Sequence, residues 1–156
     1  MTEFERLQKI VERLRAEDGC PWDREQTHTS LKPPCIEEAA EVICGINILE
    51  ETGNADNLKE ELGDLLLQVL MHAQIAEEEG LFTMDDVCRG ISEKMLRRHP
   101  HVFGQETVSD AGDVRVKWED IKKGEKVGKE WTLPYLSRAF DESKELIDVA
   151  RKRKGI

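Results

Sequence analysis

Residues 36–74 constrain the possible folds of this chain more than any other stretch. Apolar residues recur there at helical spacing, first as Ile36, Ala39 and Ile43 and then as Leu58, Leu62, Leu65 and Leu66. The spacing predicts two helices, one from Pro33 or Pro34 to near Gly53 and one from Asn54 or Asp56 to about Glu79. Because the second helix is apolar around much of its circumference, we expect it to lie at the centre of a helical bundle.

Acidic residues interrupt both apolar runs. Glu38 and Glu41 are three residues apart in the first run, and Glu61 and Asp64 are three apart in the second. Residues at this spacing are neighbours on one helix face, so two helices could bring four carboxylates together. Four such groups repel one another unless protons or a cation neutralise them. Ligands that are all carboxylates select hard cations such as Mg²⁺ or Mn²⁺.

Spacing alone leaves alternatives open. The four-apart pairs Glu37/Glu41 and Glu60/Asp64 also share helix faces, and all of these acids could be solvated surface groups. A di-iron bundle is a weaker alternative, because it needs two Glu-x-x-His pairs and residues 25–28 supply the only one.

The remaining sequence predicts helices and loops, with no strand pattern. Residues 3–16 form an amphipathic helix, 18–31 a polar connection, 83–99 a helix ended by Pro100, 101–112 a loop, 114–123 a short helix, and residues after Thr132 and Pro134 a last helix. A charged tail from about residue 151 is expected to fray. We therefore expect one all-α domain over residues 1–156. Gly63 either marks a close approach of another helix or is simply tolerated.

Composition narrows the classes of partner. The net charge of −10 argues against a general nucleic-acid binder. Acidic residues dominate before residue 93 and basic residues after it, so the second half could face an anion. Four scattered cysteines favour reduced thiols and a cytoplasmic protein. No apolar run approaches membrane-spanning length.

The basic half offers candidate anion contacts. Lys94 and Arg98 share a helix face near its end, and Trp118 and Lys122 share another. The basic residues could bind phosphates, or they could only compensate the helix dipole. Trp118 could stack on a base, although a core position is the default for a lone tryptophan.

Five motifs follow one another along the chain: GCPWDREQTHTSL at 19–31, EEAAE at 37–41, EELGD at 60–64, RRHPHVFG at 97–104 and KWEDIKKGEK at 117–126. Together they resemble the MazG family of nucleoside triphosphate pyrophosphohydrolases. Two departures from the family pattern stand at Pro34-Cys35, where a large residue is usual, and after Leu133-Pro134, where an aromatic ending is missing. They could alter base selectivity or assembly.

The resemblance implies an all-α fold, a homodimer or higher assembly, and Mg²⁺-dependent hydrolysis of nucleoside triphosphates to monophosphate and pyrophosphate, with Mn²⁺ as a substitute ion. It assigns the metal and catalytic roles to Glu38, Glu41, Glu61 and Asp64, and substrate contacts to Lys94, Arg98, Trp118 and Lys122. The acids Glu37 and Glu60 become outer-shell candidates. The alternatives are a non-catalytic helical module that binds nucleotide or a partner, and a pyrophosphatase specialised for one nucleotide such as dUTP or dCTP.

Overall fold

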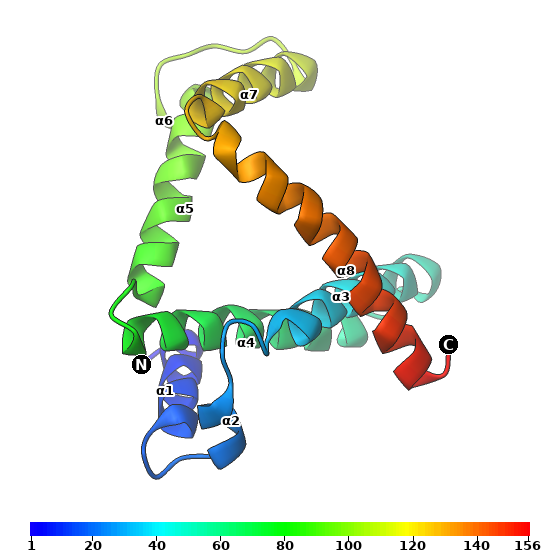
Figure 1. The fold of residues 1–156 in the computed structure, drawn as a ribbon. Coiled ribbons are helices and arrows are strands. Elements are labelled where there is room, and N and C mark those ends of the chain that lie inside the picture. The colour runs from blue at the N-terminus through cyan, green and yellow to red at the C-terminus, as the bar shows by residue number, and fades with distance from the viewer. The chain divides into compact units, whose positions relative to one another are not determined.

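The computed structural model describes residues 1–156 and is all-α, as predicted (Figure 1). Its elements are α1 (Glu3–Arg15), α2 (Pro21–Glu25), α3 (Lys32–Thr52), α4 (Asp56–Glu78), α5 (Met84–Arg98), α6 (Pro100–Phe103), α7 (Ala111–Lys126), a 3₁₀ turn η1 (Glu130–Thr132) and α8 (Leu133–Lys154). The chain forms two compact units, one of residues 1–84 with 141–156 and one of residues 85–140. None of the helices combines the length and the apolarity that crossing a membrane requires.

The core of the first unit lies between α1 and α4. A capping box starts α1, in which Thr2 accepts from the Glu5 amide and the Glu5 carboxylate accepts from the Thr2 amide. Val11 of α1 is almost fully buried against the apolar side of α4, where Leu70, Met71 and Ile75 lie. The central position predicted for this helix is therefore confirmed within the first unit.

Helices α3 and α4 form a hairpin that positions the acidic pairs. Prolines stand in the first turn of α3, where their missing N–H groups leave no helical bond unmade. Gly53 ends α3 with a φ of 74°, a left-handed conformation that favours glycine. A three-residue connection then leads into α4, so the two helices pack side by side (Figure 1).

The glycine that permits this packing is Gly45 rather than Gly63. A Cβ added at Gly45 would lie 2.7 Å from the Leu58 Cα, whereas a Cβ at Gly63 would meet nothing within 4 Å. The two backbones come together at Gly45, and Gly63 is simply tolerated.

The structure corrects the expected polar connection and the expected frayed tail. Residues 21–25 form the short helix α2, which begins at Pro21 and is held where Arg24 donates to the Glu17 carbonyl. The tail stays helical to Lys154, and side chains of its last turn pair with acidic residues of α3. These long-range ion pairs are invisible to local sequence patterns.

The second unit contains α5, α6, α7 and the start of α8. Residues 100–103 form the single-turn helix α6, although a loop was expected over 101–112. Helix α7 begins earlier and ends later than the predicted residues 114–123. The early start has a local cause, because the Asp110 carboxylate accepts from the amides of Gly112 and Asp113. Arg98 of α5 and Glu125 of α7 tie these helices together with an ion pair of 2.7 Å.

Candidate metal centre

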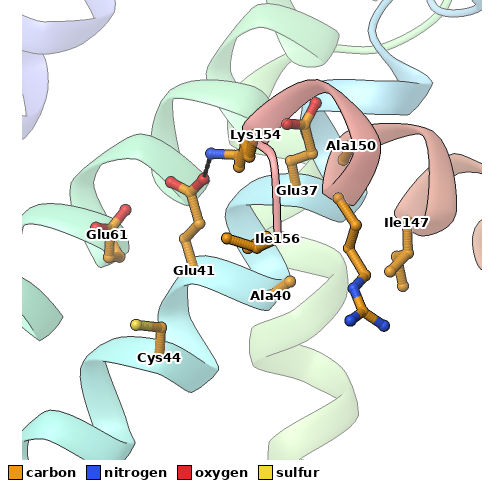
Figure 2. Close-up of a pocket in the computed structure, with 10 residues that line it drawn as sticks. Glu37, Ala40, Glu41, Cys44, Glu61, Ile147, Ala150, Lys154 and Ile156 are labelled. Atoms are coloured by element: carbon orange, nitrogen blue, oxygen red, sulfur yellow. Dashed lines mark hydrogen bonds and ion pairs between the residues drawn. The ribbon is translucent and has the colours of Figure 1, made fainter.

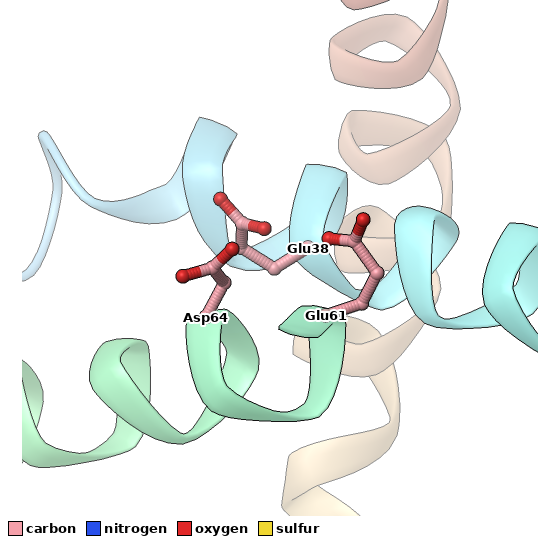
Figure 3. Close-up of side chains that lie close together, drawn as sticks. All are labelled: Glu38, Glu61 and Asp64. Carbon is pink, nitrogen blue, oxygen red and sulfur yellow. The ribbon is translucent and has the colours of Figure 1, made fainter. Parts of the chain in front are cut away.

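Three carboxylates from α3 and α4 converge. Glu38 reaches from α3 toward Glu61 and Asp64, which stand one helical turn apart on α4 (Figure 3). One oxygen atom from each residue lies within 4.8 Å of the other two. Glu38 is half-buried and Asp64 is exposed, so the group sits at the edge of the α3–α4 interface.

The local electrostatics disfavour the ionised forms of two of these acids. Burial raises the pKa of Glu38, and the charges of Glu41, Asp64 and Glu61 raise it further. Burial also raises the pKa of Glu61, followed by the charge of Glu41, against a hydrogen bond from Asn57 that lowers it. A cation placed among these oxygens would relieve the repulsion that the raised pKa values report.

Glu41, the fourth candidate ligand, is close but engaged elsewhere. Its carboxylate pairs with the ammonium of Lys154 from the last turn of α8 (Figure 2). That hydrogen bond raises the pKa of Lys154. Glu41 still acts electrostatically on Glu38 and Glu61, because its charge raises the pKa of both. The structure therefore brings three of the four predicted ligands into one cluster and places the fourth beside it.

Of the four-apart alternatives, Glu37 and Glu60 lie outside the cluster. Glu37 pairs with Arg153, and only 12% of its side chain is exposed. Glu60 is exposed on α4. The cluster thus contains one complete three-apart pair, Glu61 and Asp64, together with Glu38, and it contains no complete four-apart pair.

A cavity of about 350 Å³ adjoins the acidic residues (Figure 2). Its walls come from α3 and α4 on one side and from the end of α8 on the other, and they include Glu37, Glu41, Glu61, Ala150 and Lys154. The lining is mainly apolar, with carboxylates and cationic groups at its polar edge.

The predicted substrate-binding residues all lie in the second unit. The Trp118 ring has the Lys122 ammonium 4.8 Å and the Arg98 guanidinium 5.3 Å from its centroid. The Trp118 Nε1 is buried without a hydrogen-bond partner. Glu125 binds Arg98, so that cation is already partly neutralised. Lys94 is half-buried on α5 and is not part of this ring-centred group.

The donor set fits a hard divalent cation. All three converging groups offer oxygen, and the cluster contains neither a cysteine nor a histidine. His28, the histidine of the weak di-iron alternative, instead stacks on His72 with the two Nδ1 atoms 2.7 Å apart. Three carboxylates could hold Mg²⁺ or Mn²⁺ and leave its other positions to water or phosphate oxygens.

The sequence did not predict the contacts of Arg153 and Lys154 with the acidic face. The available signal was charge complementarity, since the run RKRK at 151–154 is basic and residues 37–41 are acidic. Complementary charge alone does not select one partner among the many acidic residues of this chain.

Comparison with known proteins identifies the family. The sequence pattern of the MazG nucleotide pyrophosphohydrolase domain matches residues 26–103, which is half of the chain. This chain therefore belongs to the MazG family, as the ordered motifs predicted. The matched residues contain all the carboxylates of the candidate metal centre together with Lys94 and Arg98.

Two of three similar proteins are named as nucleoside triphosphate pyrophosphohydrolases, and the third is the uncharacterized protein YabN. The chain is 54% identical over 123 residues to the nucleoside triphosphate pyrophosphohydrolase/pyrophosphatase MazG of Thermotoga maritima, covering 79% of this chain and 45% of that protein. It is 45% identical over 130 residues to the nucleoside triphosphate pyrophosphohydrolase of Escherichia coli K12, covering 83% and 48%. It is 54% identical over 145 residues to YabN of Bacillus subtilis, covering 88% and 29%. The chain thus spans less than half the length of these relatives.

A solved structure has the same fold. The crystal structure of a mazG-related protein from Thermotoga maritima superposes with a TM-score of 0.60 at 28% identity, covering 76% of this chain and 98% of that one. The all-α architecture is therefore shared with an experimentally determined relative.

Proposed function

We propose that this chain is a Mg²⁺-dependent nucleoside triphosphate pyrophosphohydrolase, which cleaves between the α and β phosphates and releases monophosphate and pyrophosphate. The observation that carries the proposal is the convergence of Glu38, Glu61 and Asp64 within 4.8 Å in a chain of the MazG family. The names of the Thermotoga and Escherichia relatives support the reaction. Residues 1–156 act as one MazG-like domain in this proposal.

In this proposal the carboxylates bind the divalent ion, and the ion neutralises the negative charge of the substrate phosphates. Glu38, Glu61 and Asp64 would bind Mg²⁺, or Mn²⁺ as a substitute, with Glu41 completing the set. A bound divalent ion neutralises phosphate charge and lowers the pKa of an attacking water. An acidic protein with a net charge of −10 would otherwise repel a triphosphate. Hydrolysis of this kind depends on positioning and charge neutralisation, so no Ser, Cys or His nucleophile is required.

The second unit supplies the proposed substrate contacts. Lys94, Arg98 and Lys122 offer cationic donors for phosphate oxygens, and Trp118 offers a ring for stacking. The cations already gathered at the Trp118 ring support this assignment. When a phosphate displaces Glu125, Arg98 would keep a charge-assisted partner.

Assembly and location belong to the same proposal. Helices α3 and α4 keep large apolar side chains exposed, among them Ile43 at 60% and Leu62 at 50%. Such side chains favour a homodimer that covers them. All four cysteines are unpaired, which suits the reducing cytoplasm.

The decisive experiment offers Mg²⁺ and each nucleoside triphosphate in turn and identifies the products. We expect pyrophosphate and monophosphate from the wild-type chain. Glu38→Gln and Asp64→Asn should lower kcat by about a thousandfold or more. Each substitution removes a carboxylate that holds the ion, and the ion stabilises the negative charge that develops in the transition state. Trp118→Ala and Lys122→Ala should mainly raise KM. Glu77→Gln, at an exposed position of α4 outside the acidic cluster, is the matched control and should leave kcat unchanged.

Release of orthophosphate and diphosphate, or full activity of Glu38→Gln, would overturn the proposal. Tight binding of Mg²⁺ and nucleotide with no product would favour the alternative, a non-catalytic nucleotide-binding module. Turnover of dUTP or dCTP alone would favour the specialised pyrophosphatase.

A further inference from the structure

The last turn of α8 brings two cations to the acidic face of α3. The Lys154 ammonium donates to a Glu41 carboxylate oxygen (Figure 2). The Arg153 guanidinium donates to Glu37. Both contacts join residues more than a hundred positions apart, and both lie inside the first compact unit. The tail is therefore docked on the turn of α3 that also carries Glu38.

Stability alone is a weak explanation for the Lys154 contact. The Lys154 side chain is 43% exposed and the Glu41 side chain 34%. Ion pairs with this much solvent exposure contribute little to the stability of a folded protein. The contact also involves Glu41, the predicted ligand that lies outside the three-carboxylate cluster and pairs with the ammonium.

The Glu41 carboxylate interacts electrostatically with groups on both sides of it. The charge of Glu41 raises the pKa of Glu38 and that of Glu61, and Glu41 also lines the cavity together with Lys154. The Glu41 carboxylate can therefore pair either with the Lys154 ammonium or with an ion held by the cluster. The positive charge of Lys154 occupies the Glu41 carboxylate, and it also repels a divalent cation that approaches the cluster.

We infer that Lys154 competes with the divalent cation for Glu41. The docked tail keeps its ammonium on this carboxylate, so the cation binds Glu41 only after the ammonium is displaced. The inference rests on the proposed function, since it concerns the ion of that site. It assigns to the end of α8 the regulation of metal affinity: docking of the tail weakens binding, and release of the tail strengthens it.

The test measures Mn²⁺ binding to the whole chain by electron paramagnetic resonance, without nucleotide. Lys154→Gln should bind Mn²⁺ about fivefold more tightly, because the ion pair that competes for Glu41 is lost. Lys152→Gln removes the same charge from the same helix end, where Lys152 is exposed, and it should change the affinity by less than about twofold because distant surface charges are screened. Lys154→Arg, which keeps the charge, should retain the wild-type affinity.

Two further variants separate this inference from the proposed function. In a Glu41→Gln background, Lys154→Gln should have no added effect on Mn²⁺ affinity, because the carboxylate for which the two cations compete is gone. Equal affinities of Lys154→Gln and Lys152→Gln, with Mn²⁺ still lost in Glu38→Gln, would overturn the inference and leave the metal site standing. Mn²⁺ binding that Glu38→Gln does not weaken would overturn the metal site itself and the inference with it.

Hydrogen exchange gives an independent readout of the tail. Addition of Mg²⁺ to the wild-type chain should lower the protection of the last turn of α8, since the ion displaces Lys154 from Glu41. In Glu38→Gln the same addition should leave that protection unchanged. Unchanged protection in the wild-type chain at saturating Mg²⁺ would contradict the competition.

Discussion

Among the acidic side chains whose pKa the fold shifts, the shifts occur in two opposite directions. Arg15 lowers the pKa of Glu78, and Arg98 lowers the pKa of Glu125. In contrast, burial and neighbouring carboxylates raise the pKa of Glu38 and that of Glu61. The first pattern marks structural ion pairs, whereas the second marks a place where added positive charge would be most favourable.

The Glu78 ion pair gives a prediction with a defined pH dependence. The Arg15 side chain is 7% exposed and donates to Glu78 at 2.7 and 2.9 Å, which joins α1 to the end of α4. Because the pKa of Glu78 is lowered from its ordinary 4.5, the pair stabilises the folded state above pH 4.5, and this stability is lost as the pH falls through the lowered pKa. Glu78→Gln should therefore cost about 1 kcal/mol at pH 7, since solvent screening limits a partly exposed pair.

Urea unfolding at pH 7 and at pH 3 measures this difference. Glu77→Gln is the matched control, because it removes the same charge one residue away at an exposed position. A Glu78→Gln deficit that stays the same size at pH 3 would show that the carboxylate charge is not responsible.

At the scale of elements, the α3–α4 hairpin depends on one glycine. A Cβ at Gly45 would lie 2.7 Å from the Leu58 Cα and 2.9 Å from the Leu58 N, so Gly45→Ala must push the two helices apart. We expect Gly45→Ala to lower the free energy of unfolding by about 1 to 2 kcal/mol, because the clash with the Leu58 backbone outweighs the gain in helix propensity. Since Glu38 and Glu61 face each other across this hairpin, the substitution should also weaken Mn²⁺ binding.

Gly63→Ala provides the matched control for the close approach. It stands in the same hairpin with nothing within 4 Å of its added Cβ, and it should stabilise the protein by about 0.5 to 1 kcal/mol. Thermal unfolding of both variants decides the matter, and equal effects of the two substitutions would show that Gly45 does not set the helix spacing.

Most elements were predictable because their causes are local. Apolar periodicity, the capping box at Thr2 and Glu5, and the left-handed Gly53 act within a few residues, and they place α1, α3 and α4 close to their observed bounds. The short helices α2 and α6 were missed because five and four residues carry no periodic signal. Gly63 was a candidate for close approach only because sequence cannot tell which glycine faces a neighbouring helix.

At the scale of the whole molecule, the exposed apolar side chains of α3 and α4 predict an assembly. Light scattering should give a mass of about twice 17.9 kDa for the chain. Leu62→Glu should shift the protein toward the monomer, since a charge in an apolar interface is costly to bury. Val149→Glu, at a 63% exposed position on α8, is the control and should keep the wild-type mass. A monomeric wild-type chain at high concentration would contradict the assembly.

The sequence by itself determined the helical class, the order of the main helices and the acidic pairs, since each follows from contacts between residues three or four apart. Geometry of the helix left two sets of pairs open, and the tertiary structure placed Glu38, Glu61 and Asp64 in one cluster. Only the tertiary structure attached Glu41 to Lys154, which lies 113 residues further along the chain. Helix periodicity determines which face of its own helix a residue occupies. Which distant segment packs against that face is decided by packing and charge in three dimensions.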